Sequence, residues 1–300
     1  MSVKFTILGS GSAGNCAYLE SGETRILIDA GFSTRQIRLR LASIGRAPEN
    51  LSAILLTHEH SDHISGLLGL ADKCHIPVFC NRGTQDGTIW AFKDKWSKKT
   101  NLELENSDTF RSKIDWRLFE TGASFEVGEV GIETFSIPHD SQDPVGFILH
   151  TPEGNVGFAT DLGHVTKLVL ERIRTANVLV LESNHDVKML QECPRRSWAL
   201  KQRILGRHGH ISNVAAAETI AQIMSAGLRQ LYLAHLSREC NTPELAQNIM
   251  AEQLFQIGAT HVQLSMTAQD TPCTTLEFSS FCPSQVAMGS GADHVPSSVV

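Results

Sequence analysis

The chain has 300 residues, of which 41% are hydrophobic and 19% charged, so it can form one large or two small globular domains. Its formal net charge of −6 argues against a generically basic nucleic-acid-binding protein, although a metal centre or a local basic patch can still hold a polyanion. The first residues show no export signal and no apolar run of roughly 20 residues, so we expect a cytoplasmic protein that does not bind membranes.

Two residue types stand out in the composition. The seven cysteines are scattered and include no Cys-x-x-Cys pair, which argues against a disulfide framework and against a cysteine-type zinc site. We therefore expect the thiols to be buried or unused. The thirteen histidines are more unusual, and their positions along the chain need an explanation.

Short apolar segments rich in β-branched residues alternate along the chain with segments of helical spacing. The predicted strands cover residues 3–8, 25–28, 53–56, 130–137, 145–149, 156–159, 178–181 and 230–233. The predicted helices cover residues 34–44, 62–74, 166–175, 213–226 and 243–257. Strands followed by helices, twice over, predict an α/β fold in which two β-sheets lie between helical layers, an αββα sandwich.

Two local patterns indicate boundaries. Asn213 is the predicted N-cap of the helix at 213–226, and Gly227 is the predicted residue that ends it. The stretch 283–300 is rich in serine, glycine and proline, so we expect a loose tail there. This leaves residues 1–282 as one folded domain.

A cluster of possible metal ligands follows the predicted strand 53–56. It contains His58, His60, Asp62 and His63 within six residues. Three histidines and a carboxylate in one turn would repel one another at mildly acidic pH unless something bound them. Neutral imidazoles and carboxylates suit zinc, iron or manganese. Four groups this close together cannot all reach one ion, so we expect further ligands and a second ion.

Three later strands end in a residue type that binds metals. His139, Asp161 and His235 each stand two positions after the end of a predicted strand, 130–137, 156–159 and 230–233 respectively. Taken singly, each can be an ordinary polar residue at a strand end. Together with the histidine cluster, they predict a metal site along one edge of the sandwich.

In this order the residues resemble the five motifs of the metallo-β-lactamase superfamily over about residues 3–280, with Asp29 in Ile26-Leu27-Ile28-Asp29-Ala30-Gly31 as the first. The resemblance implies two mixed β-sheets flanked by helices, with residues 1–282 as the catalytic domain. It also implies that Asp161 bridges two divalent ions and that Asp29 orients the ligand loop without touching metal. One ion would then be held by His58, His60 and His139, and the other by Asp62, His63 and His235.

The histidine at position 60 favours hydrolysis over redox chemistry, because flavodiiron-type relatives resemble a pattern with a carboxylate there. Two Lewis-acidic ions, whether zinc, manganese or iron, lower the pKa of a bridging water and clamp a phosphoryl or carbonyl oxygen. Asp62 can orient or deprotonate that water. These ligand types do not distinguish the native metal.

The segment 207–213 resembles a segment of tRNase Z and related phosphodiesterases. There the histidine that matches His210 stabilises the leaving group or the phosphate, as a catalytic histidine can at physiological pH. The predicted helix start offers backbone N–H groups to an anion, so Ser212 and Asn213 are candidate substrate contacts. Alternatively, His210 is a loop residue that caps this helix.

Two further segments resemble the WalJ/YycJ-type subgroup of DNA exonucleases. One closes the predicted strand 178–181, and there the resemblance places Glu182, Asn184 and His185 beside the metals, Glu182 and His185 as catalytic residues and Asn184 as a substrate contact. The other is the glycine- and serine-rich segment 8–15. It lacks the Gly-Lys-Ser/Thr of a P-loop, and as a turn between strands it needs no function.

Arg195 and Arg196 begin a run that mixes cations with Trp198. This run can follow a nucleic-acid backbone and stack on a base, although a solvated basic helix face explains it as well. A similar run at 93–99 carries less weight.

We therefore expect a metal-dependent phosphodiesterase, a 5′ to 3′ exonuclease on DNA rather than RNA, with no obligatory protein partner visible. One alternative is a small-molecule hydrolase, either a cyclic phosphodiesterase or a thioesterase of the glyoxalase II type. Others are a tRNase Z-like nuclease, which the missing long arm disfavours, and a binding module without turnover. The superfamily carries several of these reactions on one ligand set, so the fold alone does not select the substrate.

Overall fold

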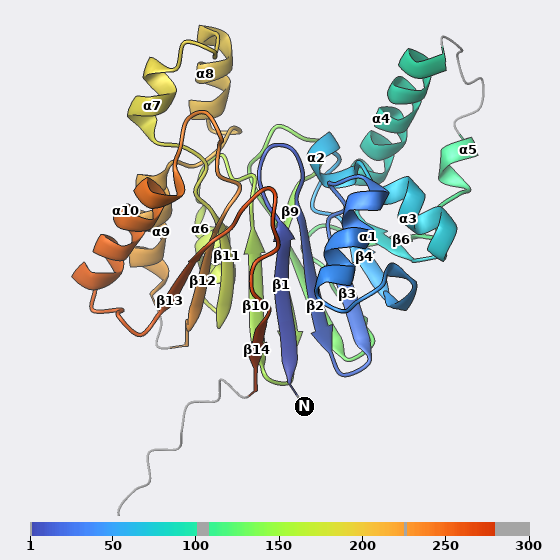
Figure 1. Ribbon diagram of the computed structural model, residues 1–300, viewed down its shortest axis with the longest axis horizontal. Helices are drawn as coiled ribbons and strands as arrows, with labels where there is room; N and C mark the ends of the chain where they lie inside the picture. Colours follow the sequence, from blue (N-terminus) through green and yellow to red (C-terminus); the bar gives the residue numbers. More distant parts are fainter. Residues whose placement is uncertain (1, 101–107, 225–226, 280–300) are drawn as a thin grey trace, which may run out of the picture.

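The computed structural model describes residues 2–100, 108–224 and 227–279 and contains two seven-stranded sheets packed against each other (Figure 1). Sheet A has the order β14-β1-β2-β3-β4-β5-β6, and sheet B the order β13-β12-β11-β10-β9-β8-β7. The strands of sheet A are β1 (Val3–Gly9), β2 (Cys16–Ser21), β3 (Thr24–Ile28), β4 (Ala53–Leu55), β5 (Val78–Cys80), β6 (Trp116–Leu118) and β14 (Leu276–Phe278). The strands of sheet B are β7 (Ser124–Val127), β8 (Val130–Ser136), β9 (Val145–Thr151), β10 (Gly154–Ala159), β11 (Val178–Glu182), β12 (Gln230–Ala234) and β13 (Gln263–Met266).

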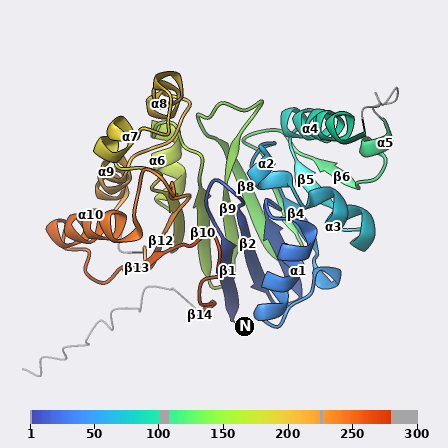
Figure 2. The same cartoon turned by 45° about the horizontal axis from the view of Figure 1, so that its top comes forward.

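Helices cover the outer face of each sheet, so the predicted αββα sandwich is confirmed (Figures 1 and 2). The elements on the side of sheet A are α1 (Thr34–Ser43), η1 (Pro48–Asn50), α2 (Ser61–Ile64), α3 (Leu67–Cys74), α4 (Arg82–Thr100) and α5 (Asp108–Arg111). Those on the side of sheet B are α6 (Lys167–Ile173), α7 (Val187–Glu192), α8 (Trp198–Leu205), α9 (Asn213–Ile223) and α10 (Pro243–Gln256). None of the helices in the described ranges is long and apolar enough to span a bilayer.

Alternate side chains of the central strands enter different cores. Ile26 and Ile28 pack between the two sheets, whereas Leu27 packs beneath the helices of sheet A. In sheet B, Val180 faces the core between the sheets and Leu181 faces the helices. Because both faces of these strands are buried, their sequences are continuous apolar runs rather than alternating patterns.

Strand direction explains why the polar residues after these strands can meet. In sheet A, β3 and β4 are parallel neighbours. In sheet B, β10, β11 and β12 are parallel, and β8 runs in the same direction because β9 is antiparallel to both β8 and β10. Parallel strands of one sheet end at the same edge. The residues that follow these strands are therefore gathered at one edge of each sheet.

Three predicted boundaries are wrong. The single helix predicted at 62–74 is divided into α2 and α3 near Gly66, where a Cβ atom would lie 2.3 Å from the carbonyl oxygen of Phe32. The N-cap of α9 is Ser212, whose side chain accepts a hydrogen bond from the backbone N–H of Ala215, and not Asn213. The same helix ends at Ile223 with Met224 as its C-cap, and not at Gly227. Residues 225 and 226 lie outside the described chain. The tail expected at 283–300 also lies outside it.

Candidate metal centre

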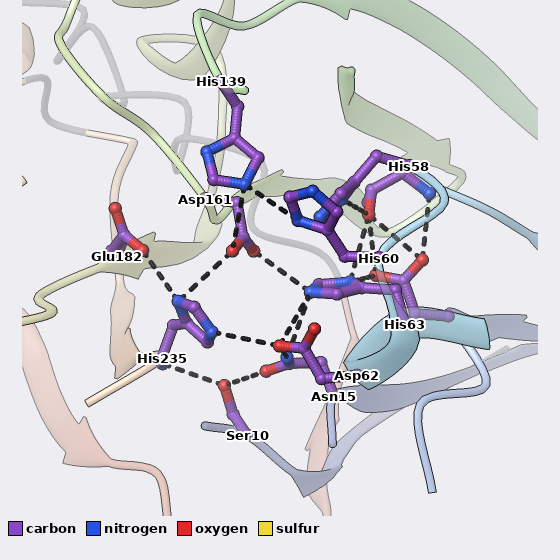
Figure 3. A network of polar contacts seen from close by, with 12 residues as sticks. Ser10, Asn15, His58, His60, Asp62, His63, His139, Asp161, Glu182 and His235 are labelled. Atoms are coloured by element: carbon purple, nitrogen blue, oxygen red, sulfur yellow. Dashed lines mark hydrogen bonds and ion pairs between the residues drawn. The ribbon is translucent and has the colours of Figure 1, made fainter. Parts of the chain in front are cut away.

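The predicted ligands from both sheets meet at the edge where the strands end (Figures 1 and 3). Sheet A supplies the loop after β4, and sheet B supplies the residues after β8, β10 and β12. Their donor atoms form overlapping groups in which all atoms lie within 4.8 Å of one another. These groups are His58, His60 and His139; His58, His63 and Asp161; Asp62, His63 and His235; and Asp161, Glu182, His210 and His235.

The backbone is unusual at three of these strand ends. Asp29, Asp161 and His235 have φ angles of 59°, 58° and 56°, in the left-handed region that residues other than glycine rarely adopt. Such a conformation costs on the order of 1–3 kcal/mol and persists only where the surroundings hold it. At His235 the backbone N–H donates to Ser10 Oγ at 2.9 Å, a contact that joins sheet B to the loop after β1.

Asp29 orients two histidines in the sheet A half. His63 Nδ1 lies 2.8 Å from Asp29 Oδ2, and both side chains are fully buried. The Thr57 hydroxyl donates to the same oxygen at 2.9 Å and lies 3.0 Å from His58 Nδ1. Because the hydroxyl proton is used on Asp29, His58 Nδ1 donates to the hydroxyl oxygen. In both histidines the lone pair that can bind a metal ion is therefore on Nε2.

Glu182 performs the same task in the sheet B half. Its Oε1 lies 2.8 Å from Nδ1 of His235 and 2.8 Å from Nδ1 of His210, and its Oε2 accepts the backbone N–H groups of Leu162 and Ile211 at 3.0 Å. Although burial opposes ionisation, the two histidines lower the pKa of Glu182 to about 2. His235 therefore also presents Nε2, on the side where Figure 3 shows Asp62.

His139 completes the pattern. Its Nδ1 donates to the carbonyl oxygen of Gly209 at 3.1 Å, and its Nε2 lies 3.3 Å from Nδ1 of His60. A carbonyl oxygen only accepts, so the proton is on Nδ1 and Nε2 carries the lone pair. Nε2 of His139 and Nδ1 of His60 therefore face the same position, where both lone pairs can bind a metal ion.

Several buried atoms at the centre have no hydrogen-bond partner among the described residues. They are His58 Nε2, Asp161 Oδ2 and His235 Nε2. Buried polar atoms are rarely left unpaired, so each calls for an explanation. Imidazole nitrogens and carboxylate oxygens that converge in this way are a donor set for divalent transition-metal ions. The residues present therefore fit a metal centre.

Charges at the centre also favour a cation. Burial opposes the charge of Asp161, yet His235 and His63 hold the pKa of its carboxyl group well below the usual range. Burial likewise opposes protonation of His63, but Asp29 and Asp161 raise its pKa well above the usual value. At His63 the carboxylates therefore outweigh burial. At His58 and His139 burial dominates and lowers the pKa, which keeps these two imidazoles neutral and able to bind a metal ion.

A cavity of about 210 Å³ opens onto these residues. His210 lines it with a side chain that is 21% exposed, and Asn184 also lines it. Burial opposes the charged imidazolium of His210, but Glu182 raises the pKa of this histidine. Two arginines contribute to the wall. Arg196 pairs with Glu239 at 2.8 Å, and Arg203 pairs with Asp140.

Other predicted site residues lie outside the wall of this cavity, as far as the described chain shows. His185 is buried, with Nδ1 3.3 Å from Asn184 Oδ1, and burial lowers its pKa to about 4. Ser212 caps α9, and the Asn213 side chain accepts a hydrogen bond from Ser183 Oγ at 2.7 Å. Arg195 is 70% exposed. His210 and Asn184 therefore line the cavity, whereas these four residues do not.

Sequence reasoning missed the contribution of the segment after β1. Ser10 Oγ donates to Asn15 Oδ1 at 2.9 Å, and Asn15 Nδ2 lies 3.3 Å from Asp62 Oδ2 and 3.1 Å from His63 Nε2 (Figure 3). A turn rich in glycine and serine carries no local signal for this role. The available hints were the resemblance of segment 8–15 to the WalJ/YycJ-type subgroup and the polar side chain of Asn15 next to Gly14.

Comparison with known proteins gives consistent results. The sequence profile of the beta-lactamase superfamily domain matches residues 24–236. The Exodeoxyribonuclease WalJ of Streptococcus pneumoniae is 37% identical over 256 residues, which cover 84% of this chain and 88% of that protein. The Exodeoxyribonuclease YycJ of Bacillus anthracis is 34% identical over 86% of this chain and 91% of its own length. The metallo-beta-lactamase fold protein YhfI of Bacillus subtilis has a similar fold, with a TM-score of 0.62, 16% identity, and coverage of 92% of this chain and 99% of its own.

Proposed function

The chain belongs to the metallo-β-lactamase superfamily, and we propose that it is a two-metal exodeoxyribonuclease that degrades DNA from a 5′ end in the cytoplasm. Two relatives whose names describe DNA exonucleases match it over more than four fifths of its length. The six cysteines in the described ranges form no disulfide, as is usual in a reducing compartment. The observation that carries the proposal is the position of His210. Glu182 holds its imidazole beside the candidate metal ligands, in a cavity whose wall includes Arg196 and Arg203.

The proposed ligand sets follow from the orientation of the histidines. His58, His60 and His139 would hold one ion and Asp62, His63 and His235 the other, with Asp161 shared between them. Bound there, two divalent ions would supply the Lewis acidity that lowers the pKa of a water molecule and offsets the charge of the phosphoryl oxygens. Zinc, manganese and iron all accept this mixture of imidazole and carboxylate.

The protein's own side chains would position the substrate and move protons. Asp62 lies 3.5 Å from His235 Nε2 and reaches the cavity, where its carboxylate can orient the attacking water. His210 faces the cavity with Nδ1 fixed on Glu182, so its Nε2 is the atom that can protonate the leaving oxygen. Arg196 and Arg203 can bind the phosphates that flank the scissile bond. Asn184 can donate to the same backbone.

The test uses the full-length protein with Mn²⁺ or Zn²⁺ and end-labelled DNA, RNA and a chromogenic phosphodiester. We expect about two metal ions per chain and release of nucleotides from the 5′ end of DNA. Loss of activity on DNA with a blocked 5′ end would support the direction, and equal activity would contradict it. Turnover of a thioester with none of the three phosphodiesters would overturn the proposal.

A further inference from the structure

A second cavity, of about 770 Å³, opens beside the metal centre between α2 and α4. His60 lines both this cavity and the one over the donor set, so the two are neighbours. Figures 1 and 2 show α4 on one side of the strand ends and α7 and α8 on the other. A strand of DNA whose phosphate lies at the metal centre can therefore reach this cavity with an adjacent nucleotide.

The wall of the second cavity is largely aromatic and apolar. Trp90 is 68% exposed and lines it, together with Phe92 and Ile64. The ring centroids of Phe92 and Phe110 are 5.9 Å apart, and this contact holds Phe92 in the cavity wall. An indole left in water next to a reactive centre is a suitable platform for a flat ligand.

Close packing places Trp90 relative to the metal centre. Gly87 of α4 lies against Glu59, because a Cβ atom at position 87 would be 2.5 Å from Glu59 Cγ. Glu59 in turn accepts a hydrogen bond from the backbone N–H of Gln142 at 2.9 Å. Residues three apart share one face of a helix, so Trp90 stands on the same face as Gly87, and both line the cavity that His60 also lines.

Charge distinguishes the two cavities. Three carboxylates line the second cavity, those of Glu59, Asp86 and Asp94, against one ammonium group, that of Lys95. The cavity over the donor set is also lined by three carboxylates, those of Asp62, Asp140 and Asp161, but two of these are proposed metal ligands, and its wall includes Arg196 and Arg203. Negative groups repel a phosphate but not a neutral base. The two sides of the site therefore suit different parts of a nucleotide.

We propose that the second cavity binds a nucleobase adjacent to the scissile phosphate by stacking it on Trp90, an inference that rests on the proposed function. Its volume lies within the range of ordinary ligand pockets. Every base has a π-face, so stacking holds the strand without selecting a sequence. The phosphates then lie toward Arg196 and Arg203 of the opposite wall.

The experiment compares intact single-stranded DNA with DNA that lacks the base at its first or its second nucleotide, using full-length protein and Mn²⁺. We expect kcat/KM of the wild type to fall about 5- to 150-fold for one of the two abasic substrates, the range that one stacked base supplies. Trp90→Ala should lose a similar factor on intact DNA and no longer distinguish the substrates, whereas Trp90→Phe should keep most of the preference. Phe255→Ala removes an equally exposed aromatic from α10 and should change neither value.

Other outcomes separate this inference from the proposed function. The inference is overturned, while the proposed nuclease function is kept, if the wild type cleaves the intact and abasic substrates equally. The same holds if Trp198→Ala rather than Trp90→Ala removes the preference for intact DNA.

If the wild type cleaves no DNA, the proposed function fails, and fluorescence tests base binding in the second cavity alone. Saturable quenching of tryptophan emission by 5-bromo-2′-deoxyuridine in the wild type, absent in Trp90→Phe, would support base binding. Equal quenching in both would overturn it.

Discussion

Two buried carboxylates, Asp29 at the end of β3 and Glu182 at the end of β11, do similar work in the two sheets. Each is fully buried, and each holds a histidine by Nδ1 at 2.8 Å, His63 in one half and His235 in the other. Asp29 also accepts one backbone N–H and Glu182 accepts two, and these contacts fix the position of each carboxylate. The two halves thus orient their candidate ligands by the same device.

The halves differ in the second histidine that each carboxylate reaches. Asp29 reaches His58 through the Thr57 hydroxyl, and both histidines of this half are candidate ligands. Glu182 reaches His210 directly, and this histidine opens into the cavity instead of joining the proposed ligand sets. The same way of fixing an imidazole can therefore supply a metal ligand in one half and a proton donor in the other.

The largest effect is expected at Asp161, which both halves share. Asp161→Asn keeps the size of the side chain and tolerates the left-handed backbone, but removes the charge between the histidines. We expect metal content to fall below the two ions per chain proposed for the wild type, and DNA cleavage to fall to background. Elemental analysis and a nuclease assay measure these effects. Retention of both ions with full activity would contradict the shared position of Asp161.

Asp29→Asn and Glu182→Gln test the similarity of the halves directly. Each should weaken metal affinity roughly 10- to 100-fold, because each removes the negative charge that orients a ligand histidine and replaces one of two accepting oxygens by an amide nitrogen. With saturating metal, Asp29→Asn should recover kcat, but Glu182→Gln should not, because His210 has also lost its carboxylate partner. Activity measured against metal concentration distinguishes the two. Equal recovery would show that Glu182 serves the ligand alone.

Much of this comparison could be predicted from local sequence. His139, Asp161 and His235 each follow an apolar run, so strand pattern and residue type together placed them at one edge. Strand β6 could not be found in this way, because its three residues are partly or fully exposed and show no apolar run. The break before α3 could not be found from local sequence either. Glycine is needed at position 66 because the carbonyl oxygen of Phe32, more than thirty residues away in the chain, leaves no room for a Cβ atom.

The roles of Ser10 and Asn15 depend on the same kind of distant contact. Ser10 meets the backbone of His235, which is 225 residues away in the sequence. A turn between two strands has the same local pattern whether or not it supports a site elsewhere. Only the closing of both sheets onto one edge brings the glycine- and serine-rich segment under Asp62.

His210→Gln should separate proton donation from metal binding. We expect kcat on DNA to fall about 10²- to 10⁴-fold, the usual contribution of a general acid, while metal content stays unchanged. Thymidine 5′-(p-nitrophenyl phosphate) has a leaving group that needs no proton, so its hydrolysis should fall far less. Glu182→Gln at saturating metal should show the same selective loss. An equal loss on both substrates would exclude the proton-donor role and leave His210 as a binding residue.

The smallest effect concerns an acid-sensitive contact that lies in sheet A away from the metal centre. Glu20 on β2 is 12% exposed and accepts hydrogen bonds from Tyr18 at 2.6 Å and Arg46 at 2.8 Å. Burial opposes its charge, but Arg46 and Tyr18 lower its pKa below the ordinary value of 4.5. The unfolded chain therefore takes up this proton first as the pH falls. The stabilisation is complete above pH 4.5 and is lost as the pH falls through the lower pKa of the folded protein.

Glu20→Gln should accordingly reduce the free energy of unfolding by about 1 kcal/mol or less at pH 7, and the difference from wild type should shrink on acidification. Urea unfolding in excess chelator measures this without the contribution of bound metal. A difference that stays constant between pH 7 and pH 3 would show that the ion pair does not carry it.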